Sequence, residues 1–131
     1  MLMNSSSKVI ALGAWFSFIG VLLGAFGAHI VRDRISASSL AIYHTGTLYH
    51  LVHALAILIV GVLIVNSSMK NLMISAKLFV VGIVLFSGSL YLLAVTGIKV
   101  LGAITPLGGL CFLSGWVILA LRATKSTASA K

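Results

Sequence analysis

Acidic residues are almost absent from this sequence: Asp33 is the only aspartate among 131 residues, and glutamate does not occur. Charged residues of both signs make up 8% of the chain, whereas a soluble domain usually carries about 25%. A single carboxylate excludes the carboxylate pairs of glycosidases and aspartic proteases. The shortage of charge also excludes a soluble domain of this size, so most of the surface is expected to face lipid.

Cysteine and proline are scarce as well. Cys111 is the only cysteine, so one copy of the chain can form neither an internal disulfide nor a thiolate cage for a metal. Gly108 and Gly109 follow the only proline, Pro106, but lack the lysine and the serine or threonine of a phosphate-binding loop. The G-x-S-x-G pattern of a serine nucleophile is missing too. We therefore expect no catalytic residue, no cofactor and no enzymatic activity.

Long hydrophobic runs dominate what is present. Hydrophobic residues make up 60% of the chain, and its mean hydropathy is +1.21. Continuous apolar stretches cover residues 9–31, 48–65, 78–97 and a fourth that starts near 101 or 106 and ends at 121. Each is long enough to cross a hydrocarbon core of about 30 Å. The sequence therefore predicts an all-α, multi-pass bundle of four transmembrane helices, with one membrane domain over residues 1–123 and a disordered tail over 124–131.

The first stretch partly resembles a secretory signal peptide, because Lys8 precedes it and residues 25–27 match a small-x-small cleavage site. However, its apolar run exceeds the usual length of about 7–15 residues, and further spans follow. We expect this segment to remain as the first transmembrane helix.

Basic residues give the chain a net charge of +8, but they are scattered between the apolar stretches. A nucleic-acid-binding surface clusters its basic residues, so no nucleic-acid partner is expected. Basic residues that flank spans instead indicate which side is cytoplasmic. One side holds Lys8, Lys70, Lys77, Arg122, Lys125 and Lys131, and the other holds Arg32, Arg34 and Lys99. This asymmetry predicts that both termini are cytoplasmic.

Two segments between the apolar stretches are irregular. Residues 35–47 mix serines with apolar side chains, and Asp33 or Ser36 can cap a helix there, so we predict a short interfacial helix between the first two spans. Thr105 before Pro106 fits an N-cap followed by a first-turn proline, which predicts that the fourth helix starts there. One longer helix kinked at Pro106 is the alternative.

Small residues recur at spacings of three or four in the first helix and mark the fourth helix. Such stripes let neighbouring backbones approach closely. We expect these residues to pack within the bundle, and homodimerisation is the alternative. The predicted packing positions are Gly13, Ser17, Gly20, Gly24, Ala28, Gly108 and Gly115, with Cys111 on the same stripe.

All four histidines fall in a short window around the first connection. On a helix with 100° per residue, His50 and His53 share a face with Tyr43 and Gly46, whereas His44 lies on a face of leucines. Ionisable side chains within a span usually face protein, so we expect the first face to point into the bundle toward the third helix. The candidate polar cluster consists of His29, Tyr43, Gly46, His50, His53, Ser87 and Tyr91.

Three interpretations of this cluster compete: structural hydrogen bonds, contact with protons or a ligand, and metal or haem binding, for example between His29 and His50. Metal binding is the least favoured, because no thiolate or second carboxylate lies nearby in the sequence. For Ser87 and Tyr91 we expect hydroxyls that bond to a carbonyl or another helix, and a substrate path is the alternative.

Several short motifs occur in a fixed order along the chain. They are GAFGAH at 24–29, YHTG at 43–46, YH at 49–50, HAL at 53–55, FSGSLY at 86–91, ITPLGG at 104–109 and GW at 115–116. In this order they resemble the YgdD-like and YwdK-like family of small bacterial membrane proteins, a domain of unknown function. The resemblance covers about residues 9–123. It implies a four-span inner-membrane protein and brings no activity, ligand or catalytic residue with it.

We therefore expect a non-enzymatic protein of the lipid bilayer that acts as an accessory, interaction or small-ligand-handling component, alone, as a homo-oligomer or with a membrane protein partner. The alternative is a small-molecule or proton-linked transporter or channel that uses the histidine and tyrosine face of the second span. That alternative predicts a wet cavity that reaches His50 and His53, and a dry bundle would count against it.

Overall fold

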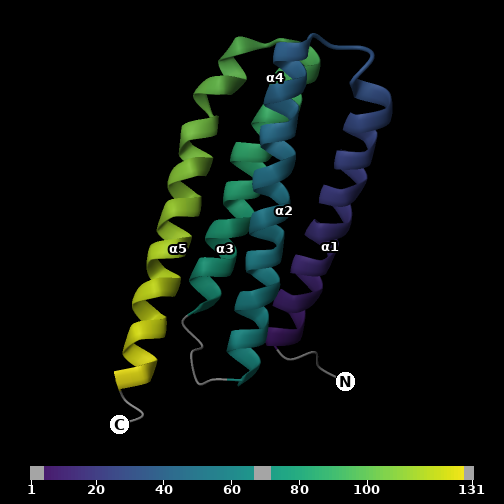
Figure 1. Cartoon of the computed structure of the whole chain (residues 1–131). Coiled ribbons are helices and arrows are strands. Elements are labelled where there is room, and N and C mark those ends of the chain that lie inside the picture. The colour runs from purple at the N-terminus through teal and green to yellow at the C-terminus, as the bar shows by residue number, and fades with distance from the viewer. Residues whose placement is uncertain (1–4, 67–71, 129–131) are drawn as a thin grey trace.

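A computed structural model describes residues 5–66 and 72–128 (Figure 1). Its elements are α1 (Ser5–Phe26), η1 (Gly27–Val31), α2 (Ala37–Asn66), α3 (Met73–Gly82), η3 (Ile83–Ser87), α4 (Gly88–Thr96), η4 (Lys99–Ala103) and α5 (Thr105–Ala128). The elements η1 and η3 are π-helical turns, and η4 is a 3-10 helix. Together they form four helices that are long and apolar enough to cross a membrane, at Ser6–Val31, Ala37–Val65, Met73–Thr96 and Lys99–Thr124. The predicted all-α, four-span architecture is confirmed.

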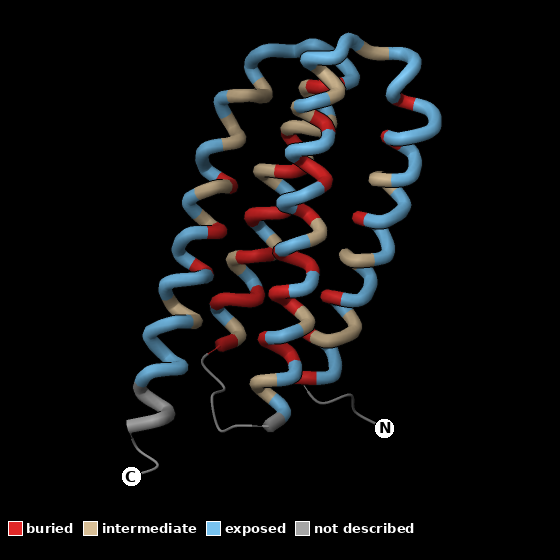
Figure 2. The backbone as a smooth tube through the Cα atoms, in the orientation of Figure 1, coloured by how far each residue is buried: buried red, intermediate tan, exposed pale blue. Residues whose placement is uncertain are grey.

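The four spans do not close into a ring. α1 packs mainly against α2, whereas α5 packs against α3 and η3. Figure 1 accordingly shows α1 and α5 on opposite sides of the central helices, and α1 begins at the same end of the bundle at which α5 ends. Buried positions concentrate where α2 faces α3 and η3 (Figure 2), around Ala54, Ile57, Phe79 and Ile83. The side of α2 that faces α5 is therefore less completely covered.

Glycines let α1 and α2 approach closely. A Cβ atom on Gly13 would lie 2.7 Å from the backbone nitrogen of Leu58, and one on Gly61 would lie 2.9 Å from the nitrogen of Ile10. These distances are shorter than a carbon–nitrogen contact allows, so only glycine fits. The predicted positions Gly20 and Gly24 face α2 in the same way, against Leu51 and Thr47 respectively.

The stripe of small packing residues that we predicted on α1 ends one turn early. Ser17 is half-buried and donates a hydrogen bond to the carbonyl of Gly13 at 2.9 Å. Ala28, however, is exposed, and Gly27 is buried in its place against the ring of Tyr43. The cause is η1, in which the amide of Arg32 donates to the carbonyl of Gly27, five residues back. Its wider turn ends the three-and-four spacing on which the prediction for Ala28 relied.

The predicted interfacial helix is wrong as a separate element. Residues 37–47 are instead the first turns of α2, which runs without a break to Asn66. Ser36 does cap a helix, because the amide of Ser39 donates to its Oγ at 3.1 Å. Tyr43 and Thr47 are buried, so this segment packs against its neighbours as part of the span rather than lying flat.

The fourth helix begins at Thr105, as predicted, and not as one longer α-helix kinked at Pro106. Gly97 ends α4 with a φ of 71°, in the left-handed region that favours glycine, and η4 then leads into α5. At its other end α5 continues to Ala128, so residues 124–128 are helical where we predicted a disordered tail. Residues 129–131 of that predicted tail lie outside the described residues.

Candidate functional site

His50 connects three spans through both of its ring nitrogens. Its Nε2 lies 2.9 Å from the carbonyl oxygen of Phe16 on α1, and its Nδ1 lies 3.3 Å from the hydroxyl of Tyr91 on α4. A carbonyl can only accept, so Nε2 carries a proton, whereas the Tyr91 hydroxyl can either donate to Nδ1 or accept from it. The neutral form of His50 therefore carries its proton on Nε2 and accepts from Tyr91 at Nδ1.

Tyr43 extends this connection toward the end of the bundle. Its hydroxyl donates to the carbonyl of Leu23 at 2.8 Å, and its ring lies against Tyr91 with centroids 4.9 Å apart. The ring also covers Gly27, where a Cβ atom would have no room. Tyr43 and His50 thus hold α1 to α2 from one buried face, as the helical spacing predicted.

Tyr43→Phe should destabilise the protein by about 0.6 kcal/mol, because interhelical hydrogen bonds in membrane proteins contribute about that much. The melting temperature of the purified protein in a mild detergent measures the effect. Tyr49→Phe is the matched control, since its hydroxyl has no hydrogen-bond partner among the described residues. An equal loss of stability in both variants would contradict the assigned role of the Tyr43 hydroxyl.

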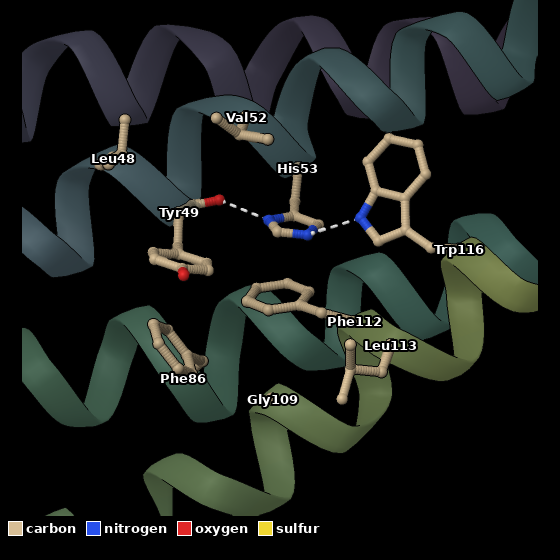
Figure 3. Close-up of a pocket in the computed structure, with 9 residues that line it drawn as sticks. All are labelled: Leu48, Tyr49, Val52, His53, Phe86, Gly109, Phe112, Leu113 and Trp116. Atoms are coloured by element: carbon tan, nitrogen blue, oxygen red, sulfur yellow. Dashed lines mark hydrogen bonds between the residues drawn. The ribbon is translucent and has the colours of Figure 1, made fainter.

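His53 connects α2 to α5. Its Nδ1 lies 2.7 Å from the carbonyl oxygen of Tyr49, one turn back, and the indole nitrogen of Trp116 donates to its Nε2 at 3.0 Å (Figure 3). An indole N–H only donates and a carbonyl only accepts, so His53 is neutral with its proton on Nδ1. Phe112 stacks on the ring with centroids 3.5 Å apart. His50 and His53 therefore carry opposite tautomers, each fixed by its partners.

The residues that complete these contacts were not predicted from the sequence. Phe16, Phe112 and Trp116 are absent from the candidate polar cluster. The one available signal was Trp116, since an indole in an apolar segment usually finds a partner for its N–H. Its partner is 63 residues away in sequence, and no local pattern indicates such a distance.

His29 does not join the predicted cluster. It is exposed on η1, whereas His50 is turned into the bundle. The pair considered for haem, His29 with His50, is therefore not brought together. Both nitrogens of His50 and of His53 are engaged, and no group of three histidine, cysteine or acidic side chains gathers in the described part of the chain.

Gly46 and Ser87 lie where α2 meets the third span. A Cβ atom on Gly46 would approach the Ser87 carbonyl and the Tyr91 ring to 3.3 Å. The Ser87 hydroxyl is fully buried and has no hydrogen-bond partner within the described residues. The interhelical hydroxyl contact is made two residues later, where the Ser89 Oγ lies 2.8 Å from the Thr105 hydroxyl.

A groove of about 540 Å³ lies between α2 and α5, with Phe86 of η3 among its lining residues (Figure 3). It lies near the midpoint of α2, and its lining residues Leu48 and Leu113 are 61% and 64% exposed, so it opens on the flank of the bundle at mid-span. The size falls within the range of small-molecule sites, roughly 300–1,000 Å³. The residues that line the groove are Leu48, Tyr49, Val52, His53, Phe86, Gly109, Phe112, Leu113 and Trp116. None of these side chains is charged.

Comparison with known proteins identifies the family. Residues 23–109 match the family model described as protein of unknown function (DUF423). The UPF0382 membrane protein YwdK of Bacillus subtilis is 45% identical over 117 residues, which are 88% of this chain and 95% of that protein. A UPF0382 membrane protein of Staphylococcus epidermidis is 42% identical over 116 residues, 88% of this chain and 94% of that protein. No solved structure matches significantly. With its four apolar spans, the chain therefore belongs to the DUF423 family of multi-pass membrane proteins, whose function is unknown.

Proposed function

We propose that this protein is a non-enzymatic binding component of the membrane that takes an apolar ligand from the bilayer into the groove between α2 and α5. The observation that carries the proposal is the position of this groove: near mid-span, open sideways and lined by aromatic and aliphatic side chains. A site of this kind is filled from the lipid phase, because its opening faces hydrocarbon rather than water. An apolar lining with a few polar groups is the usual make-up of a small-molecule site.

The histidines support binding better than transport. His50 and His53 each direct a ring nitrogen to a backbone carbonyl, of Phe16 and Tyr49 respectively, and a carbonyl does not pass a proton onward. The larger hollow opens to the side and reaches only His53. A second hollow of about 300 Å³, between α1 and α3, is lined by apolar side chains and Lys77 and does not reach either histidine.

Tryptophan fluorescence tests the binding proposal, because the chain has only two tryptophans. Trp116 lines the groove, whereas Trp15 lies on α1, 65% exposed and far from the lining residues in sequence. In the Trp15→Phe variant in lipid nanodiscs, a brominated alkane should quench Trp116 along a saturable curve. In the Trp116→Phe variant, quenching of Trp15 should rise only in proportion to the alkane that partitions into lipid. Proportional quenching of both tryptophans would contradict a binding site.

We also propose that both termini face the cytoplasm. The bundle supports the antiparallel order of the four spans, which puts Lys8, Lys77 and Arg122 at one end and Arg32, Arg34 and Lys99 at the other. By their order in the sequence, Lys70, Lys125 and Lys131 are assigned to the first side as well; they lie outside the described residues or side chains. Basic residues near span ends favour the cytoplasmic side.

The orientation predicts opposite labelling of two sites in intact cells. Ala37→Cys in a Cys111→Ser background should react with a membrane-impermeant maleimide added outside, since Ala37 is exposed at the start of α2. A reporter that works only in the cytoplasm should be active when it is fused after Lys131. Protection of the cysteine at position 37 together with an inactive reporter would invert the proposed topology.

A further inference from the structure

The groove lies in the hydrocarbon core of a membrane. Its residues on α2, from Leu48 to His53, are close to the midpoint of a helix that runs from Ala37 to Asn66. Its residues on α5 lie in the middle of the span Lys99–Thr124. Since the hydrocarbon core extends about 15 Å to each side of the midplane, phospholipid headgroups and their ester carbonyls lie beyond reach of this depth.

One hydroxyl in the groove lacks a partner. Tyr49 is 41% exposed, and no hydrogen bond of its hydroxyl exists within the described part of the chain. In Figure 3 the hydroxyl lies apart from the His53–Trp116 pair, in which both nitrogens of His53 are already engaged. An unpaired hydroxyl is costly where water is absent. The groove therefore complements a molecule that brings a hydrogen-bond acceptor to mid-membrane depth.

The walls of the groove favour a flat ring. Tyr49 is tilted by 12° from His53 and by 21° from Phe112, so these three rings are nearly parallel. Phe86 and Trp116 add two more aromatic faces, and Gly109 leaves room beside them. A ring that stacks offset on another aromatic ring gains binding energy beyond the apolar area that it buries.

The uncharged lining and the short length of the groove restrict the class of ligand further. The absence of charged side chains from the lining excludes a charged ligand at this depth, where an unpaired ion would be very costly. A transmembrane helix is about 10–12 Å across and needs a groove along much of its length, whereas this groove spans less than two turns of α2.

We infer that the ligand is a neutral, lipid-soluble molecule whose flat ring bears a carbonyl group, as in alkylated quinones, and that the Tyr49 hydroxyl donates a hydrogen bond to this carbonyl. The inference rests on the proposed function and specifies its ligand. Tyr49 positions the ring, the parallel aromatic side chains stack on it, and the apolar tail of the ligand extends into the lipid through the open side. The Trp116 indole remains bonded to His53 throughout.

The test compares two probes with the same fused-ring frame and chain, of which only one carries carbonyl groups. A 1,4-naphthoquinone with an alkyl chain is titrated into the Trp15→Phe variant in nanodiscs, and the affinity of naphthalene with the same chain is measured by its competition with the quinone. The quinone should quench Trp116 along a saturable curve, and Tyr49→Phe should weaken its apparent affinity about fivefold to tenfold, as the loss of one hydrogen bond implies. The alkylnaphthalene should bind more weakly than the quinone and be unaffected by Tyr49→Phe. Tyr43→Phe, which removes a hydroxyl outside the groove, should leave the quinone affinity unchanged.

Each of the other outcomes contradicts a different part of the proposal. Equal affinities for the two ring probes, with no effect of Tyr49→Phe, would overturn the carbonyl contact and leave the groove as a general apolar site. Saturable quenching by the brominated alkane but by neither ring probe would contradict the claim that the ligand contains a flat ring. No saturable quenching by any probe would overturn the proposed function itself. A disulfide between two copies carrying Val52→Cys, in the Cys111→Ser background, would show that a second copy covers the groove instead.

Discussion

Gly108→Ala should destabilise the bundle by about 3 kcal/mol, the upper part of the usual range for overpacking a core. A Cβ atom at this position would clash with the backbone nitrogen of Phe86 and lie 2.8 Å from its Cα. Backbone atoms cannot rotate away as the end of a side chain can, so α5 and η3 must move apart. The free energy of unfolding, measured by titration with sodium dodecyl sulfate in mixed micelles, reports the loss.

The neighbouring glycine provides a matched control. A Cβ atom on Gly109 would lie 3.8 Å from the nearest atom of the Phe86 ring, which is an ordinary van der Waals distance. Gly109→Ala should therefore change the free energy of unfolding by less than about 0.5 kcal/mol. If both variants lose the same stability, the effect comes from helix propensity or from lipid contacts and not from the close approach at Gly108.

The parts of the fold that local chemistry determines could be predicted from the sequence. Four apolar runs gave the four spans, because nothing else in this composition can satisfy the backbone in lipid. The spacing of Tyr43, Gly46, His50 and His53 predicted one buried face, since helical geometry alone places them together. Ser36 and Pro106 marked helix starts through their own side chains.

The remaining features depend on long-range packing. The π-helical turn at Gly27 changes which residue faces α2, and the sequence contains no pattern that predicts it, so Ala28 and His29 were misplaced. Continuity of α2 through residues 37–47 depends on the neighbours that bury Tyr43 and Thr47. The groove exists because α5 packs on α3 rather than on α1, and hydrophobic helices carry little information about which neighbour they choose.

His53→Ala should be about as destabilising as Gly108→Ala, at roughly 3 kcal/mol. The substitution removes a ring that stacks on Phe112 at 3.5 Å, and it leaves the Trp116 N–H without its acceptor. Both losses lie beside a groove that already lacks atoms on one side, so little can move in to fill the space. Unfolding by sodium dodecyl sulfate measures the loss, and the emission of Trp116 in a Trp15→Phe background should shift. His29→Ala is the control, because its exposed side chain should contribute less than about 0.5 kcal/mol.

A double-mutant cycle between His53→Ala and Trp116→Phe separates the hydrogen bond from the packing. A coupling energy of about 0.6 kcal/mol is expected, the usual value for a polar contact between membrane helices. Zero coupling would mean that the stability comes from the stack on Phe112 alone. The cycle also bears on function, because a variant that loses 3 kcal/mol can lose activity simply by unfolding. Loss of function in His53→Ala would therefore be no evidence for proton transfer or metal binding. Tyr49→Phe breaks no contact of the folded bundle, so this variant tests ligand binding in the groove directly.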